Sequence, residues 1–283
     1  MAATIIDGRS IAAAIREEVR AEVKALREKG VIPKMAVILA GDDPASVLYA
    51  KSKERAFKKS GIEFELHRYP ENVEEREILD RLAGLSADPT CHGIMVELPL
   101  PRHLNKERVM RAIDPDKDVD GISPINRGRM FTNKEGLFPV TPQSCIEILK
   151  RQGIPLERKD VCLIGRGDTV GKPLILLLLN ENATVTVCHT RTADLASHTL
   201  KADIIVAAAG KAGLVTKEMV RPGTVVVDAG INDLDGKTVG DVDFEGVSEV
   251  ASAITPVPGG VGSLTTALIQ KNLLKALKIV ESR

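Results

Sequence analysis

The chain has 283 residues and no net charge, because 39 basic side chains balance 39 acidic ones. A hydrophobic fraction of 43% is enough for two compact domains. The balanced charge gives no basic surface for nucleic acid or an anionic membrane. With 2% aromatic residues and no Trp, the chain also lacks stacking platforms for single-stranded nucleic acid. We therefore expect neither nucleic acid nor a membrane as a partner.

The cysteines and histidines point to a reduced protein without a metal site. The four cysteines are isolated from one another, and the five histidines show no metal-ligand spacing. The N-terminus lacks the basic start and apolar core of a signal peptide, and the longest apolar run, 174–179, is too short to cross a bilayer. These features predict a soluble, cytoplasmic protein.

The first hundred residues alternate between helical and strand patterns. Helices are predicted over 10–30, 46–61 and 72–85, and strands over 35–40, 62–69 and 93–98. This alternation predicts a largely parallel sheet. Residues 102–140 are instead dense in Pro, Gly and Asp, which favours a long functional loop at a domain junction.

A second alternating block follows a predicted helix over 142–153. Its predicted strands are 161–165, 184–188, 203–210, 224–230 and 252–255, and a last helix is expected over 262–280. The first strand ends in Gly165-x-Gly167-x-x-x-Gly171. Such a turn lets backbone N–H groups face a phosphate at the start of the next helix. The spacing is one residue longer than the usual fingerprint, so a tight turn without a ligand is the alternative.

The second strand of this block ends at His189-Thr190-Arg191. NAD-binding folds usually carry an acidic residue here to bind the ribose 2′-hydroxyl. The acid is missing, and Arg166, Thr190 and Arg191 suit a 2′-phosphate instead, which favours NADP over NAD. Ordinary solvated loop residues are the alternative interpretation.

A polar cluster is predicted in the first block. Tyr49 and Lys53 are four residues apart and share one helix face, just after a turn at the carboxyl end of a strand. Glu97 sits near the end of another strand at the same edge, in the apolar run IMVELPLP. An unpaired charge there is costly, so Lys53 is the natural partner of Glu97.

The segment KDVDG adds two more carboxylates, Asp118 and Asp120. Their spacing puts both on one side if the loop is extended. A solvated turn is the competing interpretation.

Together these motifs resemble one known family. GDDPAS followed by YAKSK, then GIMVELPLP, DPDKDVDG, TPQS, GRGDTVGKP, GDVDF and TPVPGGVGSLT are similar to the methylenetetrahydrofolate dehydrogenase/methenyltetrahydrofolate cyclohydrolase family. The resemblance implies an α/β fold of two domains across a cleft. Residues 1–141 with 263–283 would bind the folate, and a Rossmann-like domain, 142–262, would bind NADP. It also implies a homodimer.

The resemblance implies an activity and a set of site residues. Members oxidise 5,10-methylenetetrahydrofolate to the 5,10-methenyl form, and many hydrolyse that product to 10-formyltetrahydrofolate. The family's Tyr falls on Tyr49, its general acid/base on Lys53 and its pterin-binding carboxylate on Asp120. The folate rim falls on Pro258, Gly259, Gly260 and Val261, and the coenzyme site on Gly165, Arg166, Gly167, Val170, Gly171, His189, Thr190, Arg191, Gly210, Gly230, Ile231 and Asn232.

Glu97 departs from the family, which usually has Gln at this position. Hydrolysis needs a base to take a proton from water, and a nearby carboxylate favours the charged ammonium form of Lys53. The sequence therefore leaves two predictions open, namely a bifunctional enzyme and a dehydrogenase with weak or absent cyclohydrolase activity. Gly167 also replaces the usual Ser, which removes one hydroxyl from the coenzyme site.

Three other classes compete with this assignment: an enzyme acting on tetrahydromethanopterin, a non-catalytic pterin- or nucleotide-binding protein, and a Rossmann reductase with another substrate. The Tyr49, Lys53 and Asp120 set disfavours all three. We also expect a hinge near residues 140–142 and 262.

Overall fold

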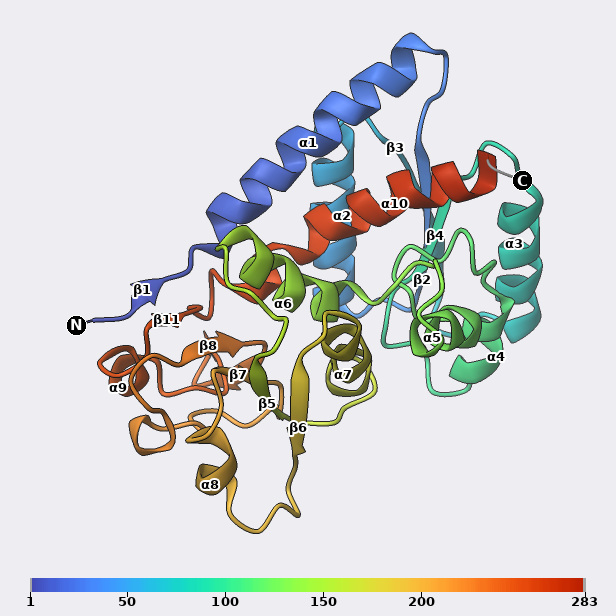
Figure 1. The fold of residues 1–283 in the computed structure, drawn as a ribbon. Helices are drawn as coiled ribbons and strands as arrows, with labels where there is room; N and C mark the ends of the chain where they lie inside the picture. The colour runs from blue at the N-terminus through green and yellow to red at the C-terminus, as the bar shows by residue number, and fades with distance from the viewer. Residues whose placement is uncertain (1, 282–283) are drawn as a thin grey trace. The chain divides into compact units, whose positions relative to one another are not determined.

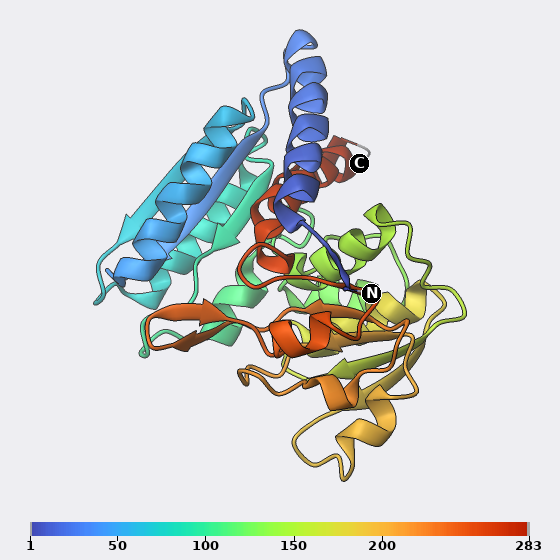
Figure 2. The same cartoon turned by 90° about the vertical axis from the view of Figure 1, so that its left-hand side faces the viewer.

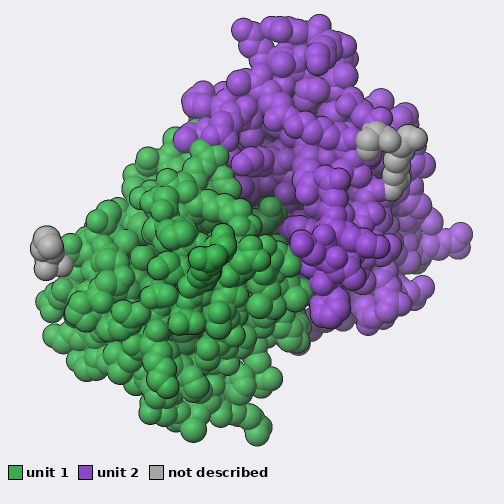
Figure 3. Space-filling view, in the orientation of Figure 1, with its two compact units in different colours: residues 1–13, 139–265 green, residues 14–138, 266–283 purple. Residues whose placement is uncertain are grey.

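The computed structural model describes residues 2–281 (Figure 1). Contacts divide the chain into two compact units, which are coloured separately in Figure 3. Unit 1 comprises residues 1–13 and 139–265, and unit 2 comprises residues 14–138 and 266–283. Within the described range, no helix is long and apolar enough to cross a membrane.

Unit 1 is built on a six-stranded parallel sheet with the order β1-β11-β8-β7-β5-β6. The strands are β1 (Thr4–Ile5), β5 (Asp160–Ile164), β6 (Thr184–Cys188), β7 (Ile204–Ala207), β8 (Val225–Asp228) and β11 (Ala253–Ile254). The central strands β7 and β8 are Val/Ile-rich and buried along their whole length. This is the composition expected of a parallel sheet covered on both faces.

The order of these strands creates a switch point between β5 and β7. From β5 the chain moves to β6 on one side, and it then crosses to β7 on the other side of β5. Ligands of open α/β sheets bind where the strand order reverses, at the carboxyl ends of the strands. The loops that follow β5 and β7 are therefore the expected ligand-binding segments.

The remaining elements of unit 1 are short. They are α6 (Val140–Arg151), α7 (Gly171–Asn180), α8 (Leu195–Thr199), α9 (Phe244–Ser248), two 3₁₀ turns, Lys217–Met219 and Val261–Ser263, and the antiparallel hairpin β9 (Asn232–Leu234) and β10 (Lys237–Val239). The hairpin was not predicted. Its two-residue turn is Asp235-Gly236, both with positive φ, and Asp-Gly between two strands is a hairpin signal that the sequence does carry.

Unit 2 contains a three-stranded parallel sheet with the order β3-β2-β4 (Figures 1 and 2). Its strands are β2 (Lys34–Ala40), β3 (Glu63–Tyr69) and β4 (Gly93–Val96). Its longer helices are α2 (Pro44–Lys59), α3 (Glu75–Ala87), most of α1 (Gly8–Glu28) and nearly all of α10 (Thr265–Glu281). Here too the order reverses beside the first strand, which places a switch point between β2 and β4.

The predicted long loop over 102–140 was wrong in part, because it contains α4 (Lys106–Ala112) and α5 (Pro124–Phe131). The polar residues and prolines of this stretch are helix-start signals. Asn105 caps α4 by accepting from the Arg108 N–H, and Ser123 caps α5, with Pro124 in its first turn.

The compact units differ from the predicted domains at the N-terminus. We expected residues 1–13 in the folate domain, and in the contact-based division they fall in unit 1, because β1 pairs with β11 and Ile6 is buried. Two residues are too short to show a strand pattern, so the sequence carried no signal for this pairing.

Candidate functional site

The predicted pairing of Lys53 with Glu97 is confirmed. The Lys53 Nζ atom lies 2.7 Å from Glu97 Oε1, and both side chains are almost fully buried. The same ammonium lies 3.5 Å from the sulfur of Met95. A buried ion pair contributes little net stability to a fold, although removing one partner is costly. Its presence is therefore better explained by a functional role than by stability.

The switch point of unit 2 explains why these two side chains meet. Asp43 caps α2 by accepting from Ser46, and Pro44 occupies the first turn, so α2 starts directly after β2. Lys53 is on the buried face of this helix, whereas the Glu97 N–H donates to the carbonyl of Ile38 and extends β4 by one residue. We predicted Ser46 as the cap; Asp43 fills that role instead.

Tyr49 and Asp120 complete this cluster. The Lys53 ammonium lies 4.2 Å from the centre of the Tyr49 ring, close enough for a cation–π interaction, and about half of the Tyr49 side chain is exposed. Burial raises the pKa of Asp120 to about 6, and the charges of Asp118 and Glu97 also raise it, while Lys53 opposes them. Asp120 is therefore within electrostatic reach of the ion pair.

The KDVDG segment reaches the cluster because it runs beside β4. The Ile94 N–H donates to the Lys117 carbonyl, and the Val119 N–H donates back to Ile94. Asp118 is fully buried and accepts from the N–H groups of 122 and 123 and from the Asn126 amide, whereas Asp120 is half-buried.

Lys117 is a structural residue that the sequence analysis missed. Its buried ammonium donates to the carbonyls of Leu85, Ser86 and Asp88 at distances of 2.7–3.1 Å. These carbonyls belong to the C-terminal end of α3, where a cation is favourable. In the sequence, Lys117 only stands beside Asp118 and Asp120, and nothing there indicates a contact with the end of α3.

The glycine turn of unit 1 fits a dinucleotide. Gly165 has φ +119°, and a Cβ there would lie 2.0 Å from the Ala208 carbonyl oxygen. A Cβ on Gly171 would lie 2.5 Å from the Gly165 carbonyl oxygen, whereas Gly167 has open space around its Cα. The turn is therefore tightly packed at Gly165 and Gly171 and open at Gly167. It leads directly into α7, as a phosphate-binding turn requires.

The predicted 2′-phosphate residues follow the two neighbouring strands. Arg166 and Arg191 are both exposed, Thr190 is exposed and His189 is half-buried. The Arg191 N–H donates to His189 Nδ1 at 3.1 Å, which holds the turn after β6. Two exposed guanidinium groups at these turns suit a phosphate better than a bare hydroxyl.

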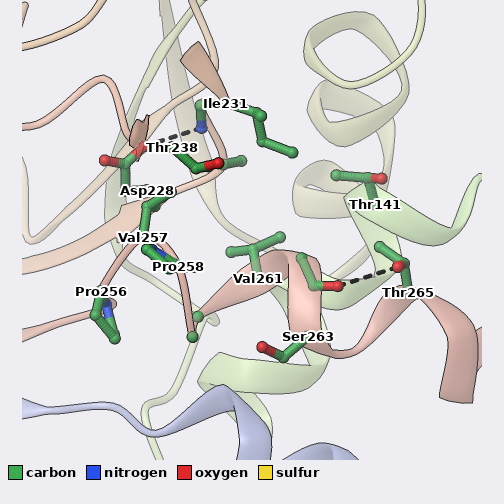
Figure 4. A pocket seen from close by; sticks show the side chains of 15 residues that line it. Thr141, Asp228, Ile231, Thr238, Pro256, Val257, Pro258, Val261, Ser263 and Thr265 are labelled. Atoms are coloured by element: carbon green, nitrogen blue, oxygen red, sulfur yellow. Dashed lines mark hydrogen bonds between the residues drawn. The ribbon is translucent and has the colours of Figure 1, made fainter. Parts of the chain in front are cut away.

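A pocket of about 290 Å³ lies within unit 1 (Figure 4). It brings together Gly230 and Ile231, predicted for the coenzyme, and Pro258 to Val261, predicted for the folate rim. Asp228, Thr141 and Thr238 also line it, and none of these three was predicted. Asp228 accepts from the Gly230 N–H at 2.9 Å.

Residues 2–281 contain no cluster of three His, Cys, Asp or Glu side chains suited to a metal ion. The parallel sheet with a glycine turn at its switch point and the buried Lys–Glu pair in a second α/β unit together define a class, that of two-unit dinucleotide-dependent enzymes.

Comparison with known proteins narrows this class. Residues 6–120 match the catalytic domain of tetrahydrofolate dehydrogenase/cyclohydrolase, and residues 139–281 match the NAD(P)-binding domain of the same family. The chain belongs to this family.

Individual relatives agree over nearly the full length. The bifunctional protein FolD of Pelotomaculum thermopropionicum is 58% identical over 278 residues, with 98% of each chain covered. The crystal structure of FolD from Campylobacter jejuni superposes with a TM-score of 0.96 at 45% identity, covering 99% of this chain and 100% of the other. The Trypanosoma brucei enzyme, complexed with NADP cofactor and inhibitor, gives 0.92 at 36% identity with full coverage of both chains.

Proposed function

We propose that this protein oxidises 5,10-methylenetetrahydrofolate to 5,10-methenyltetrahydrofolate with NADP and hydrolyses the product to 10-formyltetrahydrofolate. The observation that carries the proposal is the buried Lys53–Glu97 pair, with Tyr49 over the ammonium and Asp120 in electrostatic reach, at the carboxyl ends of β2 and β4. The names of the relatives support it, since they are bifunctional dehydrogenase/cyclohydrolases.

The oxidation step needs positioning more than acid/base chemistry. The methylene carbon lies between two nitrogens whose lone pairs expel a hydride, so the protein must mainly hold the substrate in place. Asp120 would accept from the N–H edge of the pterin and fix its orientation, and Tyr49 would pack against the ring. When bound, NADP supplies the acceptor for the hydride that leaves the methylene carbon.

The coenzyme would be held by the backbone of residues 165–171, with Arg166 and Arg191 near its 2′-phosphate. Gly210, Gly230 and Ile231 would also contact the coenzyme. The comparison of initial rates with NADP and NAD tests this assignment, and equal catalytic efficiency with both would contradict it.

The hydrolysis step makes a stronger demand on Lys53. A water molecule must lose a proton as its oxygen attacks the methenyl carbon, and the departing ring nitrogen must gain one. Lys53 can take the first proton only as a neutral amine, and a carboxylate 2.7 Å away stabilises the ammonium instead. Hydrolysis by this chain therefore requires Nζ to lose its proton beside Glu97, a loss that a neutral neighbour would favour.

The alternative is a dehydrogenase with weak or absent cyclohydrolase activity. Two absorbance assays on the purified protein separate the two functions. One follows NADP reduction with methylenetetrahydrofolate, and the other follows the loss of methenyltetrahydrofolate above its spontaneous rate. Activity in both supports the proposal, whereas oxidation alone supports the alternative.

The variant Glu97→Gln tests whether the carboxylate of Glu97 hinders hydrolysis by Lys53. The amide oxygen still accepts from Lys53 but carries no charge, so we expect hydrolysis to rise several-fold and oxidation to change little. Glu54→Gln is the matched control, because Glu54 forms a surface pair with Lys58 on the same helix as Lys53. If Glu97→Gln leaves hydrolysis unchanged, the carboxylate does not hinder Lys53.

Two further parts of the proposal concern the oligomeric state of the protein and its location in the cell. A homodimer follows from the family resemblance, and sedimentation equilibrium of the purified protein would test it. A cytoplasmic location is supported by four buried, unpaired thiols, which suit a reducing compartment. Fractionation of the source cells would test that location, and recovery outside the cytoplasm would refute it.

A further inference from the structure

A single buried carboxylate fastens the loop that follows β7. Asp241 is fully buried, and its Oδ2 atom accepts from the N–H groups of Ala209 and Gly210 at 2.6 and 2.9 Å. Its Oδ1 atom accepts from the Lys211 N–H and from the Asn232 side-chain amide, both at 2.9 Å. Four donors thus converge on one side chain, and three of them are consecutive backbone groups.

A second buried carboxylate fixes the position of the first. Asp228, at the end of β8, accepts from the N–H groups of Gly230 and Asp241 through Oδ1 and from that of Val242 through Oδ2, at 2.9–3.0 Å. The segment that carries Asp241 is therefore tied to the end of β8. In turn it ties down the end of β7.

Two glycines show how tightly these carboxylates are packed. A Cβ on Gly230 would lie 2.2 Å from Asp241 Cγ, and a Cβ on Gly240 would lie 1.9 Å from Asp228 Oδ2. Each carboxylate occupies the space that an ordinary side chain would fill. Asp241 therefore packs directly against the backbone of Gly230.

The fastened loop lies at the switch point of the sheet. Residues 209–211 follow β7, and the glycine turn at Gly165 follows β5, its neighbour. The two loops are in direct contact, because Gly165 packs where a Cβ would lie 2.0 Å from the carbonyl oxygen of Ala208. Ala209, Gly210 and Lys211 are exposed, although β7 itself is buried. The carboxylate thus sets the shape of an exposed loop where a ligand of the sheet would bind.

We propose that Asp241 is a positioning residue for coenzyme binding, which holds the loops after β7 and β8 in the shape that accepts the dinucleotide. The inference rests on the proposed function, since it assumes that NADP is the ligand. Asp241 would make no direct contact with the coenzyme and would act by fixing the shape of these loops.

The variant Asp241→Asn disrupts this arrangement in either orientation of the amide. If the NH₂ group replaces Oδ2, it faces the N–H groups of Ala209 and Gly210. If it replaces Oδ1, it faces Lys211 N–H and the Asn232 amide. Two donors lose their acceptor in both cases, and the loop must move to satisfy them.

We expect Asp241→Asn to raise the dissociation constant and the KM for NADP by about tenfold or more. The kcat at saturating coenzyme and the KM for the folate should stay within about threefold, because the cluster around Lys53 is untouched. Asp235→Asn is the matched control, since Asp235 is exposed in the turn of the β9–β10 hairpin and Asn tolerates its positive φ.

The decisive measurement is equilibrium binding of NADPH, followed by its own fluorescence, together with urea unfolding of each variant. A lower urea midpoint with an unchanged dissociation constant would mean that Asp241 only stabilises the fold, and this overturns the proposal. If wild-type protein does not bind NADPH, the proposed function fails rather than the role of Asp241.

Asp228→Asn covers the case in which Asp241→Asn does not fold. Its amide can keep the two bonds from Gly230 and Asp241 and lose only that from Val242. The fold should survive, and coenzyme binding should weaken by a smaller factor of about two to five. If Asp241→Asn does not fold and Asp228→Asn binds NADPH as tightly as wild type, the proposal is refuted.

Discussion

Replacing Asp120 by Asn should stabilise the protein in a pH-dependent way. Burial raises the pKa of this half-buried carboxyl from 3.8 to about 6, and the charges of Asp118 and Glu97 add to the effect. A raised pKa means that the folded protein holds the proton more tightly than the unfolded chain. The resulting stability is fully present below pH 4 and is lost as the pH rises through 6.

The size of this loss follows from the shift. About two pKa units correspond to about 3 kcal/mol of unfolding free energy at pH 8. Asn cannot ionise and so avoids the loss. We therefore expect Asp120→Asn to be more stable than wild type by up to about 3 kcal/mol at pH 8, with the difference fading towards pH 4.

Urea unfolding followed by circular dichroism at several pH values between 4 and 8 measures the difference. Asp80→Asn is a suitable control, because Asp80 forms a 3.6 Å surface pair with Arg76 and is largely exposed. A stability difference that does not grow with pH would refute the reasoning. In the same variant the KM for the folate should rise strongly, since the pterin loses its charged acceptor, and an unchanged KM would contradict the role of Asp120.

Three other substitutions test the positioning of the sites. Lys117→Met should lower the unfolding free energy by about 3 kcal/mol, because three carbonyls at the end of α3 lose their donor, and a thermal midpoint equal to that of wild type would disprove this role. Gly165→Ala should abolish measurable NADPH binding, since its Cβ would lie 2.0 Å from a backbone oxygen; retained binding would show that the turn is not the coenzyme site. Gly8→Ala should displace the loop at Gly260, whose carbonyl oxygen would lie 2.2 Å from the new Cβ, and should raise the KM for the folate in steady-state assays, whereas an unchanged KM would remove that loop from the site.

The predictable parts of the fold are those with a strong local period. The strands at 35–40, 161–165 and 184–188 were found within one residue of their ends, because short runs rich in strand-forming residues between turn residues have few other interpretations. The pairing of Lys53 with Glu97 was equally predictable. It required only that both residues follow the carboxyl ends of strands in one parallel sheet.

The missed parts depend on contacts between segments far apart in sequence. Asp241 binds the backbone of 209–211, and Lys117 binds the end of α3, about thirty residues away in each case. Neither residue has a local pattern that reveals its partner. The helices α4 and α5 were missed for another reason, since Pro, Asn and Ser were counted as loop residues although they also start helices.

Five carboxylates of the two sites differ in how they are satisfied, and this difference identifies the one that is open to a ligand. Asp118, Asp228 and Asp241 each accept at least two backbone N–H groups, and Glu97 pairs with Lys53. No hydrogen bond to the Asp120 carboxylate is found within residues 2–281; burial and the charges of Asp118 and Glu97 disfavour its ionised form, and Lys53 offsets them only in part. A half-buried carboxylate in that position can accept from a donor outside the chain. The N–H edge of a pterin supplies that donor, so the residue that costs the folded protein stability is the one best placed to orient the substrate.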